Sequence, residues 1–430
     1  MFKNIIIIST VLLTALLFFG CSDRGTNIDR PDYTIRNGYQ GVFTNDGGHL
    51  FPTYLGFSMF SSVQKVPGIN YKIYIPQGYT IGGERYPVLY LLSPFRGNEY
   101  YYLNRGLVAI ADKMIAEGQI KPMIIVCLDG SAGYGGTFYG DSYSGGKYAE
   151  AIGDKLGLWN EGTVIDYFDG VFETDTVRAA RAISGFGMGG YGAMRIAIAH
   201  SENFSSVSAV SAPLDFDGAA GAGGFKPLFQ ELINILDTAG RGYITRAEYK
   251  DVDTSYDKPL RTMLLAAACS FSPHYYDFSG ISSYGDSAHA AVASDTVVLS
   301  DTMTYINPEA FIRFHLPFDT AGNVYEGPDS IWTKWMSNNV QSILQNHPDA
   351  FDNMAVKMFT LADDEYGFNT QTVDFANYLE GYLSGRGITG DLTPLEFDGY
   401  EGYPATSGQF IYDILPAILK FHSDNFPAQQ

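Results

Sequence analysis

The sequence predicts an α/β fold in which a mostly parallel β-sheet carries helices on both faces. Two observations support this prediction. Short apolar runs alternate with helical patterns along most of the chain, and a glycine-rich turn joins one predicted strand to a helix and a further strand. The predicted strands are residues 71–75, 88–92, 123–128, 180–186, 205–212 and 356–362, and the predicted helices are residues 107–117, 193–200, 370–383 and one that starts near residue 409.

The carboxyl ends of the parallel strands indicate where a ligand should bind. In such sheets the ligand lies beyond these ends, against the connecting loops. The glycine-rich turn and the loops after Leu92, Leu128 and Ala362 all belong to this edge. We therefore expect the candidate site there.

The first 39 residues predict a targeting segment and a tether. Residues 1–20 contain one cation, Lys3, followed by an apolar run and then by Gly20 and Cys21, which is typical of a signal peptide with a lipoprotein cleavage site. An incidental cysteine is the alternative, but the small residue before Cys21 and the polar residues after it favour lipidation. We expect a cell-envelope lipoprotein, periplasm-facing or on the cell surface, anchored to the membrane by lipid on Cys21, with a tether over residues 21–39 and a domain over residues 40–425.

Charge and cysteine content disfavour several classes of protein. The chain has 27 basic and 47 acidic residues and a net charge of −20, which argues against nucleic acid and anionic lipid as partners. Beyond Cys21 there are only Cys127 and Cys269, so neither a disulfide framework nor a cysteine-rich metal site is expected. Cys127 lies in a predicted core strand and is most simply a buried thiol, although pairing with Cys269 stays open. No cofactor is predicted.

The glycine-rich turn has the spacing of a nucleophile elbow. The pattern G-x-S-x-G places a serine on a sharp turn between a strand and a helix, and its glycines give the turn room. Residues 185–189 read G-F-G-M-G, so Gly187 stands where the serine should be and offers no atom for an acyl-enzyme. The alternative is a glycine-rich turn without chemistry, because this spacing alone is weak evidence.

Four ordered motifs together resemble the esterase family of α/β-hydrolases that includes esterase D and feruloyl-esterase-like enzymes. They are residues 86–92 (YPVLYLL), 97–99 (GNE), 129–139 (DGSAGYGGTFY) and the elbow at 184–194. The similarity extends from about residue 71 to residue 421, with an insertion after Asp217. The resemblance implies an α/β-hydrolase fold, a Ser-Asp-His triad in this chain order and an oxyanion hole of backbone amides.

The triad that this resemblance implies is incomplete. The nucleophile position is Gly187 and the base position is Gly408, so the serine and the histidine are both missing. The acid position is Asp364, with Asp363 as the alternative if the loop is one residue out of register. His422 is the only histidine after Asp364, and it lies far along the last helix, roughly 20 Å from the catalytic edge at 1.5 Å per residue.

The oxyanion hole that the resemblance implies also departs from the family pattern. Its donors are expected at Met188, directly after the nucleophile position, and in the loop after residues 88–92. Where the family has His-Gly, this loop has Ser93 and Pro94, and Pro94 has no backbone N–H. Ser93 and Ser184 have no identifiable base, so the sequence argues against a Ser-His mechanism.

The insertion, about residues 217–304, contains a segment that resembles a degenerate EF-hand loop. Residues 237–248 have the right length, with Asp237 and Glu248 at the ends and glycine at the sixth position. Ala239 and Arg241 replace two oxygen ligands, so no metal is predicted. A chance helix-turn-helix with a glycine is the alternative.

Residues 253–304 are predicted to be irregular, as a lid over the strand edge. Nearby aromatic residues are candidates for ligand binding: Trp332 and Trp335 as an apolar wall, and Tyr100 and Tyr101 for stacking on sugars or phenolic groups. Ordinary packing would explain the same aromatic residues.

Two functions agree with these observations. The first is a lipid-anchored, non-catalytic pseudo-esterase that binds a carbohydrate or an aryl-ester-type ligand, or acts as a surface scaffold. The second is an active carboxylic-ester hydrolase, similar to feruloyl or acetyl esterases, in which Asp363 or Asp364 activates water directly. The fold alone does not determine function, so the site must decide between them. Because the serine and the histidine are missing, the site favours the first function.

Overall fold

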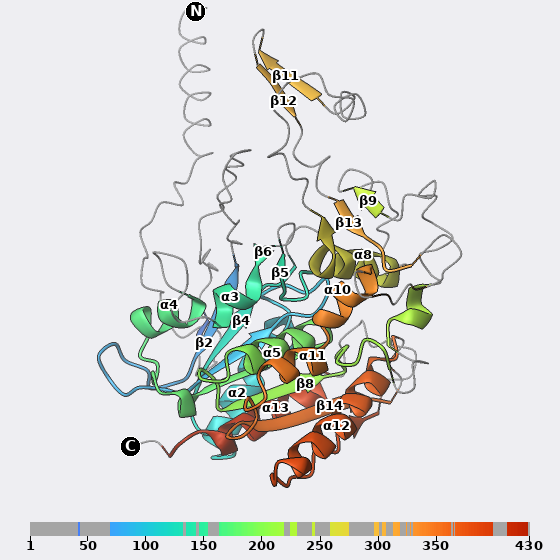
Figure 1. Cartoon of the computed structure of the whole chain (residues 1–430). Helices are drawn as coiled ribbons and strands as arrows, with labels where there is room; N and C mark the ends of the chain where they lie inside the picture. Colours follow the sequence, from blue (N-terminus) through green and yellow to red (C-terminus); the bar gives the residue numbers. More distant parts are fainter. Residues whose placement is uncertain are drawn as a thin grey trace, which may run out of the picture. The chain divides into compact units, whose positions relative to one another are not determined.

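Eight of the described strands form one mostly parallel sheet in the computed structural model (Figure 1). These strands are β1 (Val42–Phe43), β2 (Tyr71–Ile75), β3 (Val88–Leu92), β4 (Ile124–Leu128), β7 (Arg181–Phe186), β8 (Ser206–Val210), β14 (Ala355–Leu361) and β15 (Leu395–Phe397). Their order across the sheet is β1-β2-β4-β3-β7-β8-β14-β15. All neighbours from β4 to β15 are parallel, whereas β1 and β4 each pair with β2 in the antiparallel direction.

The described part of the chain lies entirely in the unit Tyr33–Gln430. The structure describes residues 42–43, 69–131, 135–142, 146–153, 163–218, 224–229, 243–245, 259–274, 296–300, 303–306, 313–318, 324, 327, 330–362, 364, 366–398 and 411–428. The predicted lipidation site Cys21 and the tether lie outside these residues.

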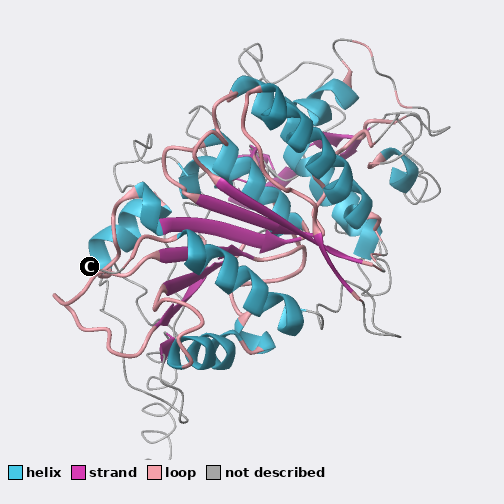
Figure 2. Cartoon of the chain, turned by 90° about the horizontal axis from the view of Figure 1, so that it is seen from below, coloured by secondary structure: helices cyan, strands magenta, loops and turns pink. Residues whose placement is uncertain are grey.

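Helices cover both faces of the sheet, as Figure 2 shows. They are α2 (Leu107–Ala116), α3 (Tyr148–Gly153), α4 (Val164–Val171), α5 (Met188–Ala199), α8 (Pro259–Phe271), α10 (Ile331–Ser337), α11 (Val340–Asn346), α12 (Phe368–Gly385) and α13 (Ile411–Asn425). Strand β3 shows how the faces divide. Leu89 and Leu91 join one core with α2 and α13, while Val88, Tyr90 and Leu92 join the other with α5 and α12. This two-residue alternation along a doubly buried strand confirms the predicted α/β-hydrolase fold.

Shorter elements complete the described structure. They are the 3₁₀ turns η1 (Leu103–Arg105), η2 (Arg178–Ala180) and η4 (Lys226–Phe229), and the short strands β5 (Asp141–Ser142), β6 (Gly146–Lys147), β9 (Tyr243–Thr245), β10 (Pro273–His274), β11 (Thr296–Ser300), β12 (Met303–Ile306) and β13 (Arg313–His315). Strand β13 pairs with both β9 and β10, so two strands of the insertion and β13, which follows it in the sequence, form a small second sheet.

Two expectations from the sequence are wrong. Residues 253–304 are not irregular throughout, because Pro259–Phe271 forms α8, whose apolar residues from Met263 onward are buried in the core. The helix after the elbow begins at Met188 rather than at residue 193. Glycines lower the intrinsic helix propensity of its first turn, but close packing on the sheet determines the structure there.

The two described cysteines are not joined in a disulfide. Cys127 and Cys269 are buried, and they belong to the cores on opposite faces of the sheet. Among the described residues, none of the helices has the length and apolar character needed to cross a membrane.

Candidate functional site

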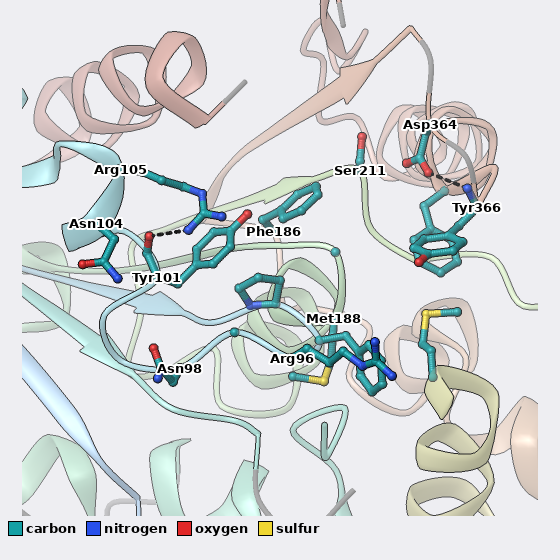
Figure 3. Close-up of a pocket in the computed structure, with 16 residues that line it drawn as sticks. Arg96, Asn98, Tyr101, Asn104, Arg105, Phe186, Met188, Ser211, Asp364 and Tyr366 are labelled. Carbon is teal, nitrogen blue, oxygen red and sulfur yellow. Dashed lines mark hydrogen bonds between the residues drawn. The ribbon is translucent and has the colours of Figure 1, made fainter. Parts of the chain in front are cut away.

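A cavity of about 240 Å³ lies at the carboxyl edge of the sheet, where loops after β3, β7, β8 and β14 meet. This is the edge that the sheet topology predicts for a ligand. Its apolar lining includes Pro94, Phe95, Phe186, Met188, Met263 and Phe368. Its polar lining includes Arg96, Asn98, Tyr101, Asn104, Arg105, Ser211, Asp364 and Tyr366. Figure 3 shows these groups around the end of β7.

Gly187 lies at the elbow itself and lines the cavity. It separates β7 from α5 and has φ 55° and ψ −117°. Residues that carry a Cβ rarely adopt this backbone conformation. Its N–H donates to the carbonyl of Val210 over 2.8 Å, which fixes the turn against β8. A Cβ at this position would meet only the Ser211 carbonyl oxygen, at 4.0 Å. Space for a side chain is therefore present, and only the backbone conformation favours glycine.

The neighbouring glycines are required by packing. A Cβ at Gly189 would lie 2.2 Å from the carbonyl oxygen of Leu92, and one at Gly185 would lie 2.3 Å from the backbone of Gly189. Real Cβ atoms do not approach backbone atoms so closely. The elbow therefore brings α5 directly against β3, and Gly187 is the elbow position with room for a side chain.

Met188 and Pro94 occupy the expected oxyanion-hole positions, and both line the cavity. Met188 is the first residue of α5, so its N–H belongs to the first turn, which has no intrahelical acceptor. Pro94 has no N–H to offer. It instead starts a tight turn in which its carbonyl accepts a hydrogen bond from Gly97 over 2.9 Å. Of the two expected donors, one amide is present.

Asp364 lines the same cavity as Gly187, although the two are far apart in the sequence. It follows β14, and its Oδ1 accepts a hydrogen bond from the N–H of Tyr366 over 2.9 Å (Figure 3). Asp363, the alternative acid, and Gly408, the expected base position, lie outside the described residues. Among the described residues that line the cavity there is no histidine.

The serines and the histidine that the sequence analysis considered as catalytic residues form structural hydrogen bonds instead. Ser93 accepts a hydrogen bond from the N–H of Gly130 over 3.0 Å. Ser184 lies within β7, where its hydroxyl is 2.7 Å from that of Ser208. His422 of α13 is fully buried and bonds to the hydroxyls of Ser206 and Ser208. Burial lowers the pKa of His422 to about 3, so it is neutral and structural.

Sequence reasoning missed several polar residues of the cavity. Arg96 has a positive φ of 60°, which is unusual for a residue with a side chain. Its N–H donates to the carbonyl of Gly135 over 2.7 Å, and its Nη2 donates to Oγ1 of Thr262 in α8 over 2.9 Å. Arg96 could have been predicted as a cavity residue, because it lies on the loop directly after a predicted strand. Arg105 lies in the 3₁₀ turn η1, which has no periodic pattern that would have indicated a role.

The aromatic candidates divide into two groups. Tyr101 lines the cavity. Tyr100 is not part of the lining; the ammonium nitrogen of Lys72 lies over its ring, 4.7 Å from the ring centroid. Trp332 and Trp335 do not line this cavity; they are buried in an aromatic cluster with Phe229 and its neighbours. Large indole rings gain most from complete burial, and core packing accounts for both of them.

Most of the degenerate calcium loop, including Asp237 and Glu248, lies outside the described residues. The described part, Tyr243–Thr245, forms β9 and pairs with β13. In the part of the chain that the structure describes, no group of three or more His, Cys, Asp or Glu side chains could hold a metal ion.

Comparison with known proteins supports an esterase-like protein. Residues 67–220 match the family described as "Putative esterase", a segment that includes β3, the elbow and β8. Over this segment the sequence is thus esterase-like, and the fold is that of an α/β-hydrolase. The positions of Asp364 and Gly408 lie beyond the matched segment.

Two curated relatives are similar to part of the chain. Esterase Rv1288 of Mycobacterium tuberculosis is 30% identical over 152 residues, which cover 34% of this chain and 29% of that protein. An endo-1,4-beta-xylanase/feruloyl esterase of Xylanibacter ruminicola is 35% identical over 137 residues, covering 31% of this chain and 18% of that protein. The chain thus spans less than a third of either relative.

Solved structures resemble a larger part of the chain at low identity. A ferulic acid esterase is 15% identical, with a TM-score of 0.48 over 90% of this chain and 100% of that one. An S-formylglutathione hydrolase from Agrobacterium tumefaciens is also 15% identical, with a TM-score of 0.48 over 92% of this chain and 99% of that one.

Proposed function

We propose that this protein is a non-catalytic, esterase-like lipoprotein that binds a ligand in the elbow cavity. One observation carries the proposal: Gly187 occupies the elbow, lines the cavity and has open space above it, but offers no nucleophilic atom. The ligand class that we propose is a carbohydrate or an aryl-ester-type compound. A role as a surface scaffold at the cell envelope, anchored through Cys21, belongs to the same proposal.

The geometry of the elbow supports a protein that does not catalyse ester hydrolysis but keeps a ligand pocket. A serine at this φ and ψ would hold a strained backbone at a cost of about 1–3 kcal/mol, which glycine largely removes. The cavity itself persists, with apolar walls from Phe186 and Phe368 and polar groups from several loops. A pocket of this kind can bind without reacting.

An active hydrolase is the second candidate, and one observation favours it. Asp364 lines the same cavity as Gly187, and the space at position 187 is open. A carboxylate in such a place can serve as a general base toward water. Under this alternative, Asp364→Ala abolishes ester hydrolysis by the wild-type protein.

We expect Gly187→Ser alone to leave ester hydrolysis at the background rate. Space for the hydroxymethyl group exists, but a serine hydroxyl without a positioned base is a poor nucleophile at neutral pH. The assay is release of nitrophenol from short-chain nitrophenyl esters, after circular dichroism has shown that the variant is folded. A second change, Gly408→His, is needed to supply the base. Appreciable turnover by the single variant would show that another base is present and would contradict the proposal.

A further inference from the structure

Polar groups lie on two sides of the cavity. Figure 3 shows Arg105, Asn104 and Tyr101 on one side and Asp364 with Tyr366 on the other, with Phe186 between them, while Arg96 lies apart from Arg105, beside Met188. Hydrogen-bond donors therefore predominate at one end, which we call the donor end and define by Arg105 and Tyr101. The other end presents the carboxylate of Asp364.

The hydroxyl of Tyr101 is a buried donor without a partner. The residue is 7% exposed, and its hydroxyl has no hydrogen-bond partner among the described residues. Its ring stacks on Phe186 with the centroids 6.4 Å apart, and Figure 3 shows the hydroxyl extending from the loop toward Phe186. Burial raises the pKa of Tyr101, so its hydroxyl stays protonated. A hydrogen bond from this hydroxyl to an acceptor on a ligand would therefore stabilise the complex. Native structures rarely leave such a group unpaired without a reason.

Arg105 places a guanidinium beside this hydroxyl. Its Cζ lies 3.8 Å from the ring centroid of Tyr101, and its Nη1 donates to the Tyr101 carbonyl over 3.0 Å. The cation is thus held in one orientation at the cavity wall. A planar guanidinium in a fixed position matches the two oxygens of a carboxylate.

The described lining of the cavity contains more cations than anions, unlike the whole chain. Among the described residues, two arginines, Arg96 and Arg105, and one aspartate, Asp364, line the cavity, although the chain carries a net charge of −20. A single negative group on the ligand is favoured at the donor end. A multiply charged group such as a phosphate fits less well, because Asp364 faces the same small space.

We propose that the cavity selects a small aryl carboxylate, with its carboxylate on Arg105 and the Tyr101 hydroxyl and its ring beside Phe186. This inference rests on the proposed binding function and narrows the ligand from an uncharged ester to a free acid. A volume of about 240 Å³ suits one ring with a short acid chain rather than an oligosaccharide. Asp364, at the other end, accepts a hydrogen bond from a hydroxyl on the ring.

The test compares an acid with its own ester. The full-length protein is titrated by calorimetry with 4-hydroxyphenylacetate and with its methyl ester. We expect the acid to bind at least tenfold more tightly than the ester. Arg105→Gln should remove most of this preference, and Arg105→Lys should restore only part of it, since lysine keeps the charge but lacks the planar fork.

Neighbouring tyrosines provide a matched control for folding. Tyr101→Phe should weaken binding of the acid several-fold, while Tm in the absence of ligand stays equal or rises, because an unpaired buried hydroxyl is removed. Tyr102→Phe should lower Tm and leave acid binding unchanged. The reason is that the hydroxyl of Tyr102 donates a hydrogen bond to the Leu92 carbonyl over 2.9 Å, which the variant loses.

The outcomes separate this inference from the function on which it rests. Equal affinity for acid and ester, or acid binding that Arg105→Gln leaves unchanged, would overturn the carboxylate inference while ligand binding stands. Hydrolysis of the methyl ester by the wild-type protein would overturn the proposed non-catalytic function instead. Failure of both compounds to bind would overturn the carboxylate inference, whereas the non-catalytic function, whose proposed ligands include carbohydrates, would stand.

Discussion

Gly189→Ala is expected to destabilise the protein by more than about 4 kcal/mol, a loss that only a few mechanisms produce. On an exposed helix the same change stabilises by about 1 kcal/mol, because glycine is a poor helix former. Here a Cβ would lie 2.2 Å from the carbonyl oxygen of Leu92 and 2.8 Å from that of Ser93. These are backbone atoms at the end of a central strand, so α5 must move away from the sheet. Chemical denaturation followed by circular dichroism measures the effect.

Gly187→Ala is the matched control for this prediction. It adds the same methyl group two residues away, where a Cβ would meet only the Ser211 carbonyl oxygen at 4.0 Å. Its cost is confined to the positive φ of 55° and should be about 1–3 kcal/mol. Equal stability of the wild-type protein and Gly189→Ala would show that α5 does not lie against β3 as described.

Acidification is expected to destabilise the protein through His422. An unfolded histidine binds a proton below about pH 6.5, whereas burial lowers the pKa of His422 in the fold to about 3. Between these two values the unfolded state binds more protons, so the free energy of unfolding falls as the pH falls. The slope approaches about 1.4 kcal/mol per pH unit, and the total loss is about 4–5 kcal/mol by pH 3. Above pH 6.5 this contribution is constant.

His422→Gln isolates this contribution. Glutamine can still bond to the serine hydroxyls, which lie 2.8 Å and 2.9 Å from the two ring nitrogens, but it does not titrate. The variant should be less stable than the wild-type protein at neutral pH because the ring no longer fills its site. Between pH 6.5 and pH 4.5 the wild-type protein should lose about 2.5 kcal/mol more than the variant. Parallel stability curves for the two proteins would mean that His422 is accessible to protons in the fold.

Local sequence patterns were sufficient to predict the sheet. Strands β2 and β3 were predicted to the residue because their apolar runs end at turn-forming residues. The glycine spacing located the elbow, and the position of Asp364 directly after a strand placed it on the same edge. Each of these inferences depends on a short stretch of chain and on the geometry of parallel strands.

Contacts between distant segments were beyond this reasoning. The first turn of α5 was missed because its glycines lower helix propensity. Close contacts with other segments explain them: Gly189 lies against Leu92, and Gly190 lies against Ala212. The hydrogen bond from Arg96 to Thr262 joins residues 166 positions apart, so nothing in either neighbourhood predicts that α8 helps to close the cavity. The guanidinium of Arg105 lies over the ring of Tyr101, a contact that no spacing rule predicts.

Ester hydrolysis by the purified wild-type protein tests the central claim most directly. Short-chain nitrophenyl and feruloyl esters are assayed against a heat-denatured control, with Asp364→Ala in parallel. We expect no turnover above the control, because the elbow residue Gly187 offers no nucleophile. Turnover that Asp364→Ala abolishes would contradict the account and would mean that the cavity catalyses hydrolysis through its carboxylate.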